Sequence, residues 1–309
     1  MTTSEPLVAI LMCTYNGERF LAEQLNSFLN QTHKNIVLWI SDDGSTDRTL
    51  DIVKEYQGKF SKNRLKVVKG PSKGSVINFL SILCRPDLKA DYYSFADQDD
   101  IWEKEKISTS LSKANKFPKD TAVLYGSRTK TVDENGEEMG YSTVFSKAPC
   151  FKNALVQSIA GGNTMLMNNI AADIMRKAGP LEVVSHDWWA YMLISGAGGE
   201  VIYDDYPSLL YRQHGNNQIG ANTSWAARFK RLGLLLSGSF REWNNTNVNA
   251  LLKVKYLLNK ENQAILDKFE NFRNGSLLHR VVGLWKLGIF RQTFLGNLAL
   301  AFAIILKKI

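Results

Sequence analysis

The chain has 309 residues, 44% hydrophobic and 22% charged, so it can bury a full core and is neither disordered nor collagen-like. Its net charge of +8 is uneven: residues 1–224 hold 24 Lys and Arg against 26 Asp and Glu, whereas residues 225–309 hold 14 against 4. In the basic C-terminal segment aliphatic and aromatic residues separate the charges, which disfavours nucleic acid as a partner and favours anionic lipid.

The N-terminus and the cysteines indicate a cytoplasmic protein. No basic region precedes an apolar stretch long enough to act as a secretory signal. Cys13, Cys84 and Cys150 are odd in number, widely spaced and without a CxxC pair, so we predict neither a disulfide framework nor a zinc site.

The first half of the chain alternates β-rich runs with helical patterns, which predicts a mostly parallel sheet covered by helices. Strands are expected at residues 7–12, 36–40, 65–68 and 92–95, and helices at 21–29, 46–56 and 76–83. Because the carboxyl ends of such strands form the ligand crevice of an open α/β sheet, the polar residues after three of these strands should converge on one site.

The second half is mixed. We expect strands at residues 122–127, 164–167 and 208–215, a turn through Asn135 and Gly136, and a helix that begins at His186. With no internal repeat and no low-complexity linker, one α/β catalytic domain followed by a helical extension is the simplest division.

From about Ser224 onward the pattern is helical and basic. Its longest nearly uncharged run, residues 292–306, is shorter than the roughly 20 apolar residues that a spanning helix needs. After Ser276 we therefore favour helices lying on a bilayer surface; before Asn274, packing on the catalytic domain or a dimer seam is at least as well supported. The side chains expected to meet lipid are Trp285, Phe290 and Phe294 at headgroup depth, and Lys286, Arg291, Lys307 and Lys308 at anionic headgroups.

An acidic run, Asp97, Gln98, Asp99 and Asp100, follows the expected strand at 92–95. Carboxylate oxygens suit a hard cation, and Mg²⁺ or Mn²⁺ held by one or two carboxylates plus substrate phosphates is the usual arrangement. A solvated acidic turn or a helix cap is the alternative. The position at the carboxyl edge of the sheet favours a metal site.

A second acidic pair, Asp42 and Asp43, follows the expected strand at 36–40. A carboxylate there can accept hydrogen bonds from a base imide or a ribose hydroxyl. The alternative is a helix cap with a turn, which Asp47 could supply by itself. No GxGxxG follows the first strand, so a dinucleotide site is not indicated.

Two histidine-containing motifs stand in the second half. Asp187, beside Trp188 and Trp189, could act as a general base next to aromatic faces that stack on sugar rings, although from these residues alone a helix-capping aspartate is the favoured explanation. His214, next to a polar loop, could ligate a metal or contact a diphosphate, whereas most isolated histidines are structural.

Five segments in this order resemble family 2 glycosyltransferases with the GT-A fold, and more narrowly their rhamnosyltransferase-like members of bacterial cell-wall and surface polysaccharide assembly. They are TYNGERFLAEQLNSFLNQT, SDDGSTDRT, DQDDIW, HDWWAY and YRQHGNNQ, and the resemblance covers roughly residues 5–220. It implies a GT-A catalytic domain at residues 1–220, with a nucleotide-sugar half at about 1–125 and an acceptor half at about 126–220. Residues 221–309 would form a helical, basic, membrane-associating or oligomerisation region.

The resemblance also implies a role for each matching residue. Asp187 would be the catalytic base. The nucleotide-sugar would contact Thr14, Tyr15, Glu18, Asp42, Asp43, Asp97 and Gln98; the metal would contact Asp99, Asp97 and His214; and the sugar and acceptor pocket would include Trp102, His186, Trp188 and Trp189. The family's processive members carry a QxxRW element and several membrane spans, neither of which is seen here, so one or a few sugars should be added.

The implied reaction is an inverting, Mn²⁺- or Mg²⁺-dependent transfer of L-rhamnose from dTDP-β-L-rhamnose to a lipid-linked saccharide at the inner face of the bacterial plasma membrane, by a peripheral protein that could be a homodimer. A UDP-hexose donor remains open, because no spacing distinguishes the two donors. A nucleotidyltransferase should carry a Gly-rich loop with Arg after its first strand, where CTYNGE stands instead. A non-enzymatic membrane adaptor, in which the acidic loops only cap helices, is the alternative from another class.

Overall fold

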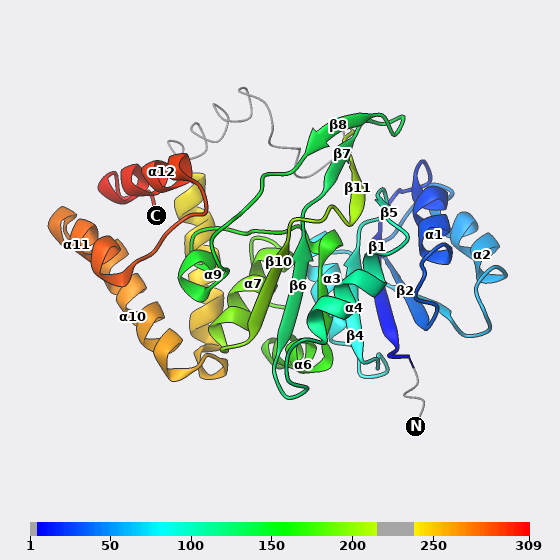
Figure 1. Cartoon of the computed structure of the whole chain (residues 1–309), viewed down its shortest axis with the longest axis horizontal. Helices are drawn as coiled ribbons and strands as arrows, with labels where there is room; N and C mark the ends of the chain where they lie inside the picture. The colour runs from blue at the N-terminus through cyan, green and yellow to red at the C-terminus, as the bar shows by residue number, and fades with distance from the viewer. Residues whose placement is uncertain (1–4, 215–237) are drawn as a thin grey trace.

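A seven-stranded sheet lies at the centre of the molecule (Figure 1), and the computed structural model describes residues 5–214 and 238–309. Its strands are β1 (Val8–Thr14), β2 (Ile36–Asp42), β3 (Leu65–Lys69), β4 (Tyr92–Ala96), β6 (Val123–Ser127), β9 (Leu166–Asn168) and β10 (Glu200–Asp204). They are ordered β10-β6-β9-β4-β1-β2-β3, and every neighbouring pair is parallel except those of β9, which runs antiparallel to β4 and β6.

Helices cover both faces of this sheet, because successive strand side chains point to opposite sides. Ala9 and Leu11 of β1 face one core layer, and Val8 and Ile10 face the other. The first layer is completed by α3 (Ser75–Leu83), α6 (Asn169–Ala178) and α7 (His186–Gly196), and the second by α1 (Leu21–Leu29), α2 (Thr49–Gln57) and α4 (Lys106–Ala114). The predicted fold class, a mostly parallel α/β sheet flanked by helices, is confirmed.

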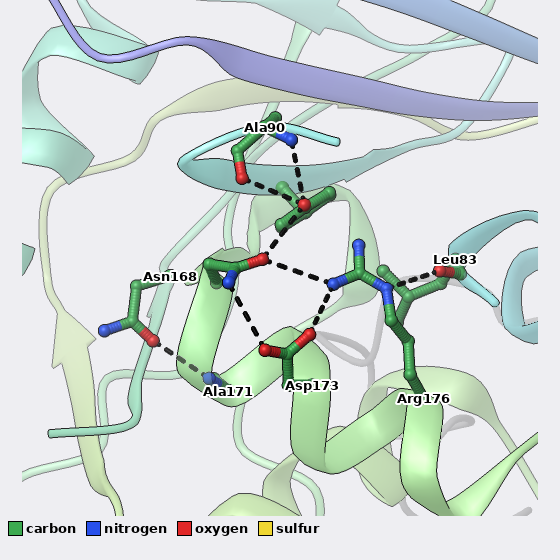
Figure 2. Close-up of polar contacts among 8 residues, drawn as sticks. Leu83, Ala90, Asn168, Ala171, Asp173 and Arg176 are labelled. Atoms are coloured by element: carbon green, nitrogen blue, oxygen red, sulfur yellow. Dashed lines mark hydrogen bonds and ion pairs between the residues drawn. The ribbon is translucent and has the colours of Figure 1, made fainter. Parts of the chain in front are cut away.

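Polar contacts hold α6 against the sheet (Figure 2). The Arg176 guanidinium reaches out of α6 and donates through Nε to the carbonyl oxygen of Leu83, at 3.0 Å, while Nη1 donates to Asp173 at 2.8 Å. The Tyr93 hydroxyl of β4 donates to Asn169 Oδ1 at 3.1 Å. These contacts join the end of α3, the start of β4 and α6 near the amino ends of the parallel strands.

A smaller sheet adjoins the carboxyl edge of the large one. It contains β5 (Ile101–Trp102), β11 (Leu209–Arg212), β7 (Lys130–Val132) and β8 (Glu138–Tyr141), in that order. Because β5 directly follows the acidic run and β11 directly precedes His214, this sheet brings two distant parts of the chain together.

Four helices, at the left of Figure 1, follow the two sheets in the chain. They are α9 (Ser239–Lys253), α10 (Lys260–Asn274), α11 (Leu277–Leu287) and α12 (Phe294–Ile305). Three shorter helices occur elsewhere in the described residues: α5 (Phe151–Ala154), η1 (Gly162–Thr164) and η2 (Lys255–Leu257). Leu251, Leu266 and Leu300 join the core layer that contains α7, so the helices that carry them pack on the α/β part of the molecule. The predicted helical segment from Ser224 to residue 237 lies outside the described residues. In the described ranges, no helix combines the length and the apolar character needed to cross a bilayer.

Candidate active site

The loops that follow β1, β2 and β4 meet at the carboxyl edge of the sheet. Gln98 holds the first loop by two hydrogen bonds: its Oε1 accepts from Tyr15 N at 2.9 Å, and its Nε2 donates to Tyr15 O at 3.1 Å. Thr14 Oγ1 donates to Asp42 Oδ1 at 2.9 Å. The loops therefore converge as predicted. The Tyr15 side chain in the first of these loops is 58% exposed.

The two aspartates after β2 have different surroundings. Asp42 is buried and accepts four hydrogen bonds, from the Thr14 and Ser45 hydroxyls and from the backbone N–H groups of Gly44 and Ser45. Its carboxylate therefore organises the turn. Asp43 is less buried, and its two oxygens accept from the backbone N–H groups of Ser72, at 2.7 Å, and Gly74, at 2.9 Å.

Gly70 allows the Asp43 carboxylate to lie against the backbone after β3. A Cβ atom at this position would lie 2.6 Å from Asp43 Oδ1 and 2.9 Å from the Asp42 carbonyl oxygen. Glu18 also binds a backbone group of another loop. Its Oε2 accepts from Arg48 N at 2.9 Å, which satisfies a donor at the start of α2.

The acidic run forms a cluster of negative charge. Burial, together with the charges of Asp99 and Asp187, raises the pKa of Asp97 to about 8. The Asp99 Oδ2 atom lies 2.7 Å from His214 Nε2, across 115 residues of sequence. Asp100 is buried, its pKa is raised well above its usual range chiefly by burial, and it accepts from Asn163 Nδ2 at 2.5 Å. Asp100 is therefore a structural member of the cluster.

The donor set fits a divalent cation. Asp97 and Asp99 would supply oxygens and His214 a nitrogen beside Asp99, and a cation would offset the charges of Asp99 and Asp187, which add to the effect of burial in raising the pKa of Asp97. Among the residues that the structure describes, no three His, Cys, Asp or Glu side chains form a complete preformed metal site. The arrangement instead matches a cation held by one or two carboxylates and completed by substrate phosphates.

Asp187 lies in the first turn of α7, where the helix dipole favours a carboxylate. Its Oδ1 accepts from the Ser185 hydroxyl and from Trp188 N, the latter at 2.6 Å. These contacts orient the carboxylate through Oδ1, whereas no hydrogen bond to Oδ2 is present among the described residues. The charge of Asp187 also contributes, after burial and the charge of Asp99, to the raised pKa of Asp97.

His186 is enclosed by aromatic rings. Its imidazole stacks on Phe79, with 4.1 Å between centroids, and meets Phe95 edge-on at 5.0 Å. Burial lowers the pKa of His186 against the opposing effect of Asp187, so the ring is neutral at pH 7. Its buried Nε2 has no hydrogen-bond partner among the described residues and points at the Gly162 backbone.

The three indole rings that we predicted to line the sugar and acceptor pocket are buried. Trp102 is 3% exposed, Trp188 6% and Trp189 0%. Trp188 Nε1 donates to the carbonyl oxygen of Ala154 at 2.6 Å, and Trp102 packs edge-on against Phe28. Trp188 and Trp189 belong to the core layer that contains α7, and Trp102 belongs to the layer that contains α1.

Sequence reasoning missed Arg212 as a residue that holds the site together. Its side chain is 2% exposed and donates to the carbonyl oxygens of Asp99, at 3.2 Å, and Glu134, at 2.8 Å; it also pairs with Glu23. It lies two residues before His214, so it fixes the segment that carries the histidine relative to the acidic loop. The sequence shows Arg212 within the YRQHG motif. Its partners lie up to 189 residues away in the sequence, so no local pattern predicts these contacts.

Two further residues, Asn163 and Lys106, lie near the acidic loop. Asn163 binds Asp100, as described above. Lys106 is buried, with its Nζ 3.7 Å above the Trp102 ring and 3.3 Å from Ser94 Oγ. Burial lowers the pKa of Lys106 to about 7, although the nearby Asp100 acts in the opposite direction. The sequence analysis did not single out Lys106.

Comparisons with known proteins agree with this geometry. The model of the family described as Glycosyl transferase family 2 matches residues 9–174. The chain is 32% identical over 260 residues to a Shigella flexneri protein named dTDP-rhamnosyl transferase RfbG, covering 81% of this chain and 87% of the relative. Over 98 residues, 32% of this chain and 34% of the relative, it is 38% identical to the putative glycosyltransferase EpsE of Bacillus subtilis.

Solved structures support the same fold. S. aureus TarS 1-349, in complex with UDP-GlcNAc, has a TM-score of 0.55 at 15% identity and is covered to 92%, as is this chain. The mannosyltransferase PcManGT of Pyrobaculum calidifontis, in complex with GDP-Man and Mn²⁺, has a TM-score of 0.53 at 15% identity, with 99% of this chain and 86% of that chain covered. The fold is GT-A, and the chain belongs to glycosyl transferase family 2.

Proposed function

We propose that this glycosyltransferase moves L-rhamnose from dTDP-β-L-rhamnose to a saccharide acceptor in bacterial polysaccharide synthesis. The observation that carries the donor is the 32% identity, over most of both chains, to a relative named as a dTDP-rhamnosyl transferase. A UDP-hexose is the second candidate donor, because the similarly folded TarS was solved with UDP-GlcNAc. The family match favours an enzyme over a non-catalytic adaptor.

The donor nucleotide lies, in this proposal, in the crevice between the loops after β1 and β2. Asp43 contacts the base, Asp42 supports it by holding the turn through its four hydrogen bonds, and Thr14 and Tyr15 line the same crevice. Gln98 couples the nucleotide loop to the acidic loop. Glu18 contributes by fixing the start of α2.

The donor diphosphate binds beside Asp97, Asp99 and His214. These residues hold Mn²⁺ or Mg²⁺, which when bound neutralises charge on the departing diphosphate. Arg212 keeps the Asp99 carbonyl and the segment of His214 in register. The support for this assignment is the raised pKa of Asp97, caused by burial and then by the charges of Asp99 and Asp187, and the 2.7 Å contact of Asp99 with His214.

Asp187 is the proposed general base. Its Oδ2 takes the proton of an acceptor hydroxyl as the hydroxyl oxygen attacks the anomeric carbon from the face opposite the nucleotide. The bond from that carbon to the diphosphate oxygen breaks as the new bond forms, so the anomeric configuration inverts. Ser185 and the first turn of α7 orient the carboxylate through Oδ1.

We assign the catalytic role to residues 1–220 and a membrane-associating or oligomerisation role to residues 221–309. The acceptor in this proposal is a lipid-linked saccharide at the inner face of the plasma membrane, and one or a few sugars are added. The support is the charge of the second region, with 14 Lys and Arg against 4 Asp and Glu after residue 224.

The test is release of nucleoside diphosphate by the purified chain from a panel of dTDP- and UDP-sugars, with Mn²⁺, Mg²⁺ or EDTA, and with a rhamnosylated lipid-mimetic acceptor. We expect metal-dependent, acceptor-stimulated release from dTDP-rhamnose alone. Release from a UDP-hexose alone would show that the donor is a UDP-hexose and not dTDP-rhamnose, and would leave the proposed mechanism unchanged. If EDTA left the release of nucleoside diphosphate undiminished, the proposed role of the metal would be rejected.

A further inference from the structure

The largest exposed apolar side chains of the described chain gather on α11 and α12. Trp285 is 82% exposed, Phe294 77%, Leu278 75%, Leu295 63% and Phe302 58%. A monomeric soluble protein rarely exposes so many large apolar side chains on two neighbouring elements unless they mark an interaction site.

These side chains follow helical spacing, so each helix has one outer apolar face. The face of α11 comprises Leu277, Leu278, Val281, Val282 and Trp285, and that of α12 comprises Phe294, Leu295, Leu298, Phe302, Ile305 and Leu306. The inner faces are already used, because Leu287, Leu300 and Ile304 are buried in the main core. We call the two exposed sets together the outer face of α11–α12.

A buried arginine fixes the two helices to each other. Arg280 of α11 is 7% exposed; its Nε donates to the Ile304 carbonyl oxygen at 2.8 Å and its Nη2 to that of Ile305 at 3.0 Å, at the C-terminal end of α12. Its Nη1 donates to Gly275 O at 2.7 Å. A cation suits a helix C-terminus, where the last carbonyl groups lack partners. The outer face is therefore part of a fixed two-helix unit.

The charge of this unit selects among possible partners. Residues 275–309 contain five Lys and Arg and no Asp or Glu. Lys286 and Lys307 are exposed beside the apolar side chains. A second copy of this chain would bring like charges together, whereas anionic lipid headgroups would neutralise them.

Two side chains expected to meet lipid have other contacts. Phe290 is half-buried beneath the Lys147 ammonium, and the Arg291 guanidinium lies 5.6 Å from the centroid of the Phe240 ring. Their segment, between α11 and α12, attaches instead to the acceptor half of the catalytic part: Gln292 Nε2 donates to Lys147 O at 3.0 Å, and Asn153 Nδ2 donates to Phe290 O at 2.9 Å.

We propose that the outer face of α11–α12 docks on an anionic bilayer surface, with Trp285 and Phe294 entering the headgroup region and Lys286 and Lys307 contacting anionic headgroups. The inference deepens the proposed function by naming the surface that brings the acceptor half to a lipid-linked acceptor, and it rests on that function only for the acceptor. Docking itself needs neither donor nor metal, so it is tested without them.

The experiment is co-sedimentation of the full chain with vesicles of phosphatidylglycerol and phosphatidylcholine, compared with phosphatidylcholine alone. The test variant is Trp285→Glu with Phe294→Glu; the matched control is Met139→Glu with Tyr256→Glu, which changes residues 60% and 69% exposed on other elements. We expect the test variant to lower the vesicle partition coefficient at least about tenfold and the control to leave it within about twofold, since one lost large apolar contact alone corresponds to roughly tenfold.

Equal vesicle binding by the test variant and the native chain would overturn the proposal. So would a native chain that ignores vesicles and sediments as a dimer that the test variant converts to a monomer, since a second copy would then cover the face. Lys286→Glu with Lys307→Glu should reduce binding only to the anionic vesicles. Release of nucleoside diphosphate in the presence of a water-soluble acceptor is measured in parallel. A chain that binds vesicles but releases no nucleoside diphosphate would refute the proposed function without contradicting the docking surface.

Discussion

Replacing Gly162 by alanine puts a methyl group where the imidazole of His186 already lies. The new Cβ atom would be 3.0 Å from His186 Cε1 and 3.1 Å from Cδ2, and closer still to Nε2. The ring cannot swing away, because Phe79 stacks on it at 4.1 Å and Phe95 meets it at 5.0 Å. The loop that carries Gly162 or the start of α7 must therefore move.

The expected cost follows from this overlap. Overpacking of a filled core costs about 1–3 kcal/mol, and alanine returns at most about 1 kcal/mol by restricting the unfolded chain. We expect Gly162→Ala to lower the free energy of unfolding by about 1–2 kcal/mol. Because His186 adjoins Asp187, a shift near 1 Å at the proposed base should also lower kcat, by up to about 10²-fold.

Urea unfolding and turnover of Gly162→Ala are measured beside Gly58→Ala. Gly58 lies at the end of α2 with φ −75°, and a Cβ atom there meets nothing within 4 Å, so this control should be neutral or slightly stabilising. Adding His186→Ala to Gly162→Ala should recover part of the lost stability by removing the overlapping ring. If Gly162→Ala matched Gly58→Ala in both stability and turnover, the packing argument and the link from η1 to Asp187 would be refuted.

Three further predictions concern the site. Asp187→Asn should lower kcat by about 10²–10⁴-fold while donor affinity measured by calorimetry stays unchanged; near-native turnover with an intact fold would reject the base. Asp99→Ala should weaken Mn²⁺ binding, measured by calorimetry with nucleoside diphosphate present, and abolish metal-dependent release, whereas native Mn²⁺ affinity would reject Asp99 as a ligand. For His186 the folded-state pKa is lowered by burial, so the unfolded chain binds more protons below about pH 6.5. The contribution of neutral His186 to stability is then full above that pH and is lost as the pH falls. Between about pH 7.5 and pH 5, the free energy of unfolding in urea should fall more for the native chain than for His186→Leu. Equal decreases would contradict this prediction.

The sequence alone determined the main strands and the edge at which the site forms. The apolar runs at residues 7–12, 36–40 and 92–95 correspond to β1, β2 and β4, because strands buried on both faces are continuously hydrophobic. The parallel arrangement then requires the polar segments after them to meet. The helix predicted from residue 46 begins at Thr49, because Ser45 and Thr46 bind Asn16 of the neighbouring loop, a contact that no local pattern reveals.

Only the tertiary structure decided how particular side chains are used. Trp188 and Trp189 carry no sign of burial in the sequence, and they lie in the core because α7 is covered on all sides. Arg212 acquires its role from contacts with segments far away in sequence. In the same way, composition made α11 and α12 apolar and the segment that contains them basic, but the filling of their inner faces by Leu287, Leu300 and Ile304 decided which side remained exposed. Periodicity defines a face on each helix, and the choice between core and surface for that face depends on what the rest of the chain packs against it.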